Sequence, residues 1–128
     1  MNLRKVGYIS VLLITILMIS GCSSTKELFV GNWEALQASQ KEGTNEELSH
    51  YNYWEVRDKE ISFSNYYLTK ENGIETKKFN NENRKKYEYT WDSKAEIVIN
   101  KKVYKVEIIK NKLTISNNNM EILFERVD

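Results

Sequence analysis

The sequence predicts an all-β protein: a small antiparallel meander of eight or so strands, closed into a barrel, after an N-terminal helical signal peptide. Two observations predict the meander. Apolar and polar residues alternate through much of the chain, and turn-forming residues separate the alternating runs at short intervals. Period-2 alternation is typical of half-buried strands, and closely spaced turns are typical of a meander. A third observation, an apolar segment near the start, predicts the leader.

The first segment has the organisation of a secretory signal peptide. Arg4 and Lys5 precede an uncharged apolar run over residues 6–19. A positive region followed by a short apolar core is typical of such leaders, whereas a transmembrane helix requires about 20 apolar residues. We therefore expect residues 1–21 to be removed, which leaves 128 − 21 = 107 residues.

The end of the leader, Ile19-Ser20-Gly21-Cys22, resembles the lipobox of bacterial lipoproteins. The resemblance implies cleavage before Cys22 and a covalent diacylglyceryl group on its thiol, with no other cofactor expected. Cys22 is the only cysteine, so it has no disulfide partner within the chain. A plain signal peptide and an uncleaved anchor are the alternatives. The expected location is the extracytoplasmic face of a cell membrane.

After the leader we expect a short tether over residues 22–27 and one β-domain over residues 28–128. The mature side chains carry 19 − 2 = 17 Lys and Arg against 18 Asp and Glu, a net charge of −1. This balance gives no field that attracts nucleic acid. Abundant Lys, Asn and Ile suggest an AT-rich, Gram-positive host.

Nine segments of the domain are predicted as strands. Residues 37–52 are polar without alternation, so we expect a loop there with one helical turn over residues 45–50. Asn and Gly tolerate positive φ, and turn residues separate the runs at 58–59, 72–73 (Asn72-Gly73), 100–101, 111–112 and 117–119. Closure into a barrel would remove exposed edges. The predicted strands are 28–36, 53–58, 60–68, 74–79, 85–92, 95–100, 102–109, 112–116 and 120–127.

Gly31-Asn32-Trp33 in the first predicted strand, followed by a meander, resembles the lipocalin and calycin superfamily. The resemblance implies that Trp33 closes one end of the barrel against a basic residue near the last strand, where Arg126 lies. A guanidinium can stack on an indole ring. The alternative is a tryptophan that packs into some other β-sheet.

The sequence gives little support for catalysis. Acylation would remove Cys22 as a nucleophile, and His50 is the only histidine, so His and Cys ligands cannot assemble a metal site. His50 would need an orienting carboxylate such as Glu46 to act as a base, and a solvated loop histidine is the simpler interpretation. We expect no enzyme, no metal and no nucleic-acid partner.

Aromatic residues are the distinctive feature of the predicted strands. Tyr87, Tyr89 and Trp91 alternate along one strand and so share a face. Together with Tyr104 they are the candidate ligand-lining residues, because tyrosine hydroxyls in an apolar cup can orient a small ligand. The alternative is that they only fill the barrel.

These observations lead to a functional hypothesis. We expect a membrane-anchored, non-catalytic module that binds a small amphipathic ligand or a peptide near the bilayer. A bacteriocin immunity lipoprotein or another protective interaction protein is the alternative, as is an accessory subunit of an envelope complex. The sequence leaves the oligomeric state open.

Overall fold

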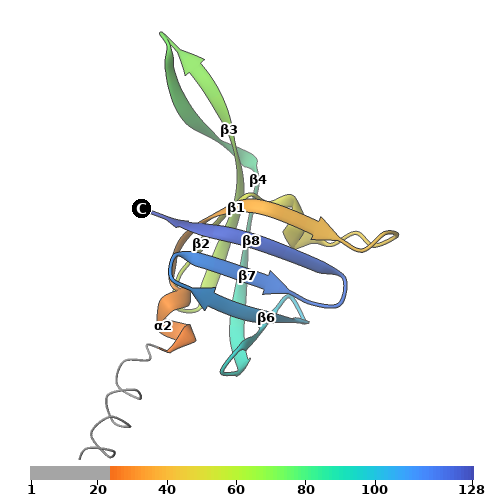
Figure 1. Ribbon diagram of the computed structural model, residues 1–128. Coiled ribbons are helices and arrows are strands. Elements are labelled where there is room, and N and C mark those ends of the chain that lie inside the picture. The colour runs from red at the N-terminus through yellow and green to blue at the C-terminus, as the bar shows by residue number, and fades with distance from the viewer. Residues whose placement is uncertain (1–23) are drawn as a thin grey trace, which may run out of the picture.

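The computed structural model describes residues 24–128 and shows a closed β-barrel (Figure 1). The predicted leader, its cleavage site and Cys22 lie outside the described residues. Within residues 24–128, no helix has the length and apolar character needed to cross a bilayer. The prediction of an all-β fold with a closed antiparallel meander is confirmed.

Each strand pairs with the next, and the last pairs with the first. All pairings are antiparallel, and β8 runs beside β1, so the sheet closes without an edge in the barrel. The elements are α2 (Thr25–Phe29), β1 (Gly31–Gln40), the 3-10 helix η1 (Glu47–His50), β2 (Tyr53–Val56), β3 (Glu60–Glu71), β4 (Ile74–Ser93), β5 (Glu96–Ile99), β6 (Lys102–Ile109), β7 (Lys112–Ser116) and β8 (Met120–Val127).

A helix stands where the sequence pattern predicted the end of the tether and the start of a strand. Ser24 caps α2, and its hydroxyl accepts a hydrogen bond from the backbone N–H of Glu27 at 3.3 Å. A serine followed three residues later by glutamate is the capping-box pattern, which favours a helix start. The predicted strand start at residue 28 is therefore wrong, and β1 begins at Gly31.

The predicted strands 74–79 and 85–92 are one strand, β4. Opposite it, the register of β3 shifts between Phe63, which pairs with Lys85, and Asn65, which pairs with Asn80. A bulge absorbs the extra residues of β4 without ending the strand. Residues 24–128 therefore form eight strands where nine segments were predicted, and β1 extends to Gln40 into the predicted loop.

Apolar side chains fill the barrel. Trp54 is fully buried, and its ring centroid lies 4.7 Å from that of Phe63 and 4.7 Å from that of Phe124. Phe29 from α2 and Leu48 from η1 join the same continuous cluster of buried residues. Both short helices therefore contribute to one core.

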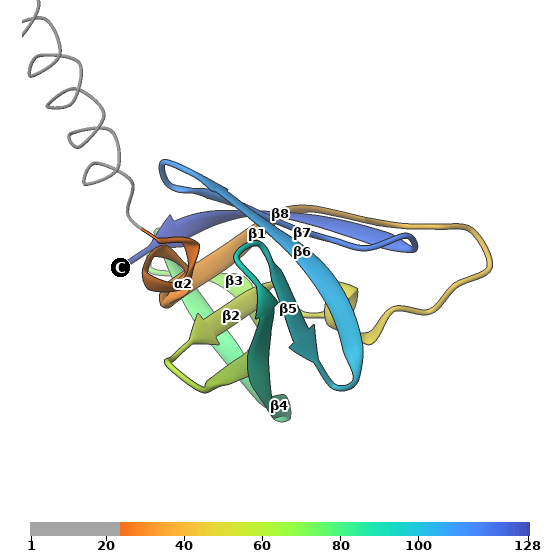
Figure 2. The same cartoon turned by 90° about the horizontal axis from the view of Figure 1, so that it is seen from below.

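Beyond the bulge, β3 and β4 continue as a two-stranded ribbon over residues 65–80, here called the hairpin arm. It rises from the barrel at the opposite side from α2 (Figure 1), and it points away from the viewer when α2 is seen from below (Figure 2). Asn72 and Gly73 form its turn with φ of 54° and 78°. Positive φ at both positions suits a tight hairpin turn.

Candidate functional site

The structure brings Trp33 and Arg126 together at the α2 end of the barrel. The guanidinium carbon of Arg126 lies 4.2 Å from the centroid of the buried Trp33 ring. The indole N–H of Trp33 donates to the carbonyl of Phe29 at 2.8 Å. The Arg126 guanidinium also donates to the carbonyls of Leu28 and Val30. This end of the barrel is therefore closed, and hydrogen bonds from Arg126 connect the α2 segment to β8.

Gly31 makes room for that closure. A Cβ atom at this position would lie 2.5 Å from Nη1 of Arg126, and the φ of Gly31 is +149°. Side chains rarely adopt this conformation, and the arginine could not keep its place beside one. The packing of Arg126 and the backbone conformation thus explain the glycine of the Gly-x-Trp pattern.

Two of the four candidate ligand-lining residues, Tyr89 and Trp91, contact Phe29 at this end of the barrel. Tyr89 and Tyr104 are buried, while Tyr87 and Trp91 are half-buried and pack against the core. The Phe29 ring makes edge contacts with Tyr89 and Trp91, at centroid distances of 5.4 and 5.6 Å. A ligand between these rings would have to displace Phe29.

Hydrogen bonds within the protein occupy the tyrosine hydroxyls near this face. The Tyr89 hydroxyl donates to the carbonyl of Arg57 at 2.6 Å, and burial raises its pKa to about 12. The Tyr87 hydroxyl donates to the Glu47 carboxylate at 2.9 Å. Lys85 also donates to Glu47, at 2.5 Å, and this bond is the main reason that the pKa of Glu47 is lowered. These groups are already paired.

The remaining polar groups near η1 are paired as well. Glu46 is buried, and its two carboxylate oxygens accept from Lys102 at 3.3 Å and Asn119 at 3.2 Å. His50 shares a hydrogen bond with the side chain of Asn45 at 2.7 Å rather than with Glu46. In the described part of the chain, no three His, Cys, Asp or Glu side chains group as metal ligands would. The cluster stabilises the loop.

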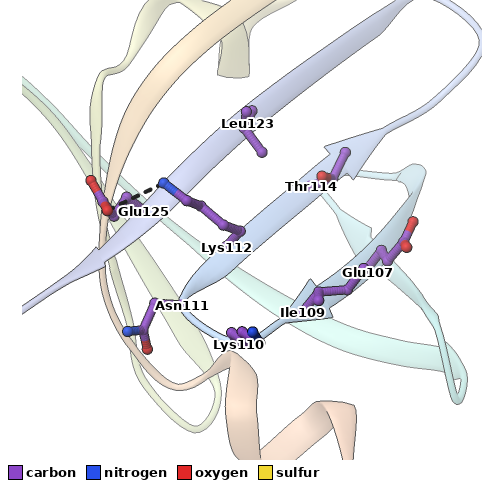
Figure 3. Close-up of a pocket in the computed structure, with 8 residues that line it drawn as sticks. All are labelled: Glu107, Ile109, Lys110, Asn111, Lys112, Thr114, Leu123 and Glu125. Carbon is purple, nitrogen blue, oxygen red and sulfur yellow. Dashed lines mark hydrogen bonds and ion pairs between the residues drawn. The ribbon is translucent and has the colours of Figure 1, made fainter.

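A groove of about 600 Å³ lies on the outer face of β6, β7 and β8 (Figure 3). Leu123 and Ile109 supply apolar surface, and Lys112 pairs with Glu125 across the strands at 3.2 Å. The groove is amphipathic, and it extends to the β6–β7 turn beside α2 (Figure 3). Its lining residues are Glu107, Ile109, Lys110, Asn111, Lys112, Thr114, Leu123 and Glu125.

The hairpin arm exposes large apolar side chains on both of its faces. Cross-strand partners share a face of the ribbon, and so do alternate residues of one strand. Leu68 therefore lies on the same face as Phe79, and Tyr67 lies on the opposite face together with Ile74. Single exposed apolar residues are common on proteins, whereas four of them gather on this one ribbon. The exposed fractions are 57% for Tyr67, 54% for Leu68, 68% for Ile74 and 43% for Phe79.

The base of the hairpin arm is fixed to the outside of the barrel. The ring of Tyr53 on β2 lies 4.9 Å from Phe79 and 6.3 Å from Tyr66, measured between centroids. Lys77 forms an ion pair with Glu34 of β1 at 3.0 Å. Burial and a hydrogen bond to Glu34 raise the pKa of Tyr66 to about 12. The arm therefore has a fixed direction.

One edge of the arm, along β3, has no neighbouring strand beyond Ser64 in the part of the chain that the structure describes. β2 pairs with β3 only as far as Ser64. At Tyr66 the side chain of Asn52 takes the place of a strand, because it accepts from the Tyr66 N–H at 2.9 Å and donates to the Tyr66 carbonyl at 3.1 Å. Backbone groups alternate in direction along a strand, so those of Leu68 and Lys70 face the same side. That edge is unpaired within residues 24–128.

Sequence reasoning identified the interior aromatic residues but not the hairpin arm. The alternation of Tyr66 and Leu68 is the pattern of a half-buried strand, and it does not reveal that the pairing of β3 with β2 ends at Ser64. No protein-family model, no curated protein and no solved structure matches the chain.

Proposed function

We propose that the protein is a lipid-anchored, non-catalytic module that binds an extended segment of a polypeptide through its hairpin arm. The observation that carries the proposal is the exposure of four large apolar side chains on a ribbon that leaves the barrel. Cys22, as the acylated residue, would hold the module on the extracytoplasmic face of a Gram-positive membrane.

The chemistry of the arm favours a polypeptide over another partner. An added strand gains main-chain hydrogen bonds along an open edge and specificity from alternate side chains. The open groups of Leu68 and Lys70 offer such bonds, and Tyr67 and Ile74 offer apolar contacts. Lysines along the arm discourage unspecific pairing between edges.

The filled barrel supports an external site. Among the candidate ligand-lining residues, Tyr89 and Tyr104 are buried, and Phe29 covers Tyr89. A small amphipathic ligand in the interior would have to open this packing, whereas a peptide on the arm displaces only water. An immunity or other protective lipoprotein and an envelope accessory subunit both act through a polypeptide, and both are compatible with this mode.

Selection from a random peptide library on the full lipidated chain tests the proposal. The counter-selection uses the same chain with Leu68→Ser and Ile74→Ser. We expect peptides with alternating apolar residues to be retained by the original chain and released by the variant, because both strand edge and side-chain contacts depend on the arm.

A matched control is Val103→Ser, which changes an exposed apolar residue on the barrel strand β6. Retention should survive this change. Peptides that bind the arm variant and the original chain equally, or a library from which nothing is retained, would contradict the proposed binding mode.

A further inference from the structure

The α2 end of the barrel carries its own exposed apolar group, here called the anchor patch: Leu28, Val30 and Ile109, with Lys26 and Lys110 at its border. The three apolar side chains are among the exposed large hydrophobic residues of the described chain. α2 packs beside β6, and the β6–β7 turn lies directly above the helix in Figure 3. The patch is therefore one surface.

Arg126 holds the parts of this patch together. Its guanidinium donates to the carbonyls of Leu28 and Val30, and its backbone N–H donates to the carbonyl of Asn111 in the β6–β7 turn at 2.8 Å. Since the same residue also stacks on Trp33, the patch is fixed to the barrel core.

The position of Cys22 brings the anchor patch to the bilayer. α2 is capped at Ser24, so only Ser23 stands between Cys22 and the folded domain. Two residues of fully extended chain span at most about 7 Å. An acyl group on Cys22 would hold this end of the barrel, and no other, within reach of the headgroups.

The composition of the patch suits a lipid surface. Exposed aliphatic side chains can enter the boundary between headgroups and acyl chains, and lysines at their border extend along it toward anionic groups. Acids near this end include Glu27 in α2, Asp128 at the C-terminus and Glu125, which pairs with Lys112, beside Lys26 and Lys110. The contact is therefore mainly apolar, with basic residues that tolerate anionic headgroups.

We infer that the anchor patch rests on the lipid bilayer and orients the domain, so that the hairpin arm points away from the membrane toward its partner. This inference rests on the lipid anchor of the proposed function. It adds that the domain has a fixed orientation at the membrane. The anchor patch contacts lipid, and the hairpin arm on the opposite side faces away from the bilayer.

Lipid quenching of a fluorescent label tests the orientation. Ile109→Cys and Ile74→Cys place a thiol in the patch or at the tip of the arm, at sites that are 61% and 68% exposed. In the acylated protein this thiol is the only free one, since Cys22 is the sole native cysteine. Each labelled chain is reconstituted in vesicles of phosphatidylglycerol with brominated phosphatidylcholine.

We expect the label at residue 109 to lose most of its fluorescence relative to bromine-free vesicles, and the label at residue 74 to lose none. Equal quenching at both sites, or none at residue 109, would overturn the orientation while leaving peptide retention by the arm intact. A mass spectrum showing an unmodified thiol at Cys22 would overturn both the anchor and the orientation.

Discussion

β3 passes through two environments that differ sharply although they belong to one strand. Its first part lies in the barrel, where Ile61 and Phe63 are fully buried between β2 and β4. Its second part lies in the hairpin arm, where Tyr67 and Leu68 are exposed and β4 is the only neighbouring strand. Burial along β3 therefore depends on the number of neighbouring strands rather than on the local residue pattern.

Apolar side chains of the barrel and of the arm also differ in what they contribute to folding and to binding. In the barrel, apolar side chains contact others on all sides, and removing one leaves a cavity. In the arm, an apolar side chain faces water, and removing it leaves the folded state almost unchanged. Apolar residues that do not stabilise the domain are thus available for a partner.

The largest expected effect comes from two phenylalanines on the paired strands. Phe63→Ala removes a buried ring and should lower the free energy of unfolding by about 3–5 kcal/mol. Phe79→Ala, on the half-exposed ring of the arm, should cost about 1 kcal/mol, because it loses mainly its contact with Tyr53. Urea denaturation followed by circular dichroism measures both, and equal losses would erase the distinction between barrel and arm.

A smaller effect is expected at the closed end of the barrel. Gly31→Ala places a Cβ against Arg126 at a φ that side chains rarely adopt, and should cost about 1–3 kcal/mol. Adding Arg126→Ala removes the clash but not the strain. The double variant should therefore lose less than the sum of the two single losses in a denaturation cycle. Strict additivity would show that the contact has no energetic consequence.

The junction between barrel and arm should respond to pH. Burial alone would raise the pKa of Glu34, but hydrogen bonds from Tyr66 and Lys77 outweigh it and the pKa is lowered. A carboxylate whose pKa is lowered in the folded state stabilises that state at pH values above its ordinary pKa of 4.5. This stabilisation is lost as the pH falls through the lowered pKa.

Glu34→Gln is therefore expected to reduce stability modestly, by about 1 kcal/mol or less, at neutral pH. The difference from the original chain should vanish in acid. Denaturation curves of both proteins across this pH range provide the measurement, and a difference that grows on acidification would contradict the role given to the ion pair with Lys77.

Much of the barrel could be predicted from sequence. Alternation over residues 102–109, 112–116 and 120–127 gave strand bounds that the structure reproduces. Asn72-Gly73 gave the turn of the arm, because its residues carry the required positive φ. These features depend on local chemistry, which a sequence displays directly.

The remaining features depend on contacts between distant segments. The merged strand β4 follows from the bulge opposite Phe63 and Asn65, and the exposure of Leu68 follows because β2 begins only at Tyr53, opposite Ser64. Neither of these two features is indicated by a local pattern in the sequence. The helix α2 is different, since Ser24 and Glu27 form a capping pattern that sequence reasoning overlooked in favour of a tether.

The role of the hairpin arm is tested by the free energy of unfolding of the chain with Leu68→Ser and Ile74→Ser, measured on the sample used for peptide retention. We expect a change within about 1 kcal/mol together with loss of the peptides, because the arm serves binding and the barrel serves folding. A chain that unfolds, or one that keeps both its stability and its peptides, would contradict the claim that the hairpin arm is the binding surface.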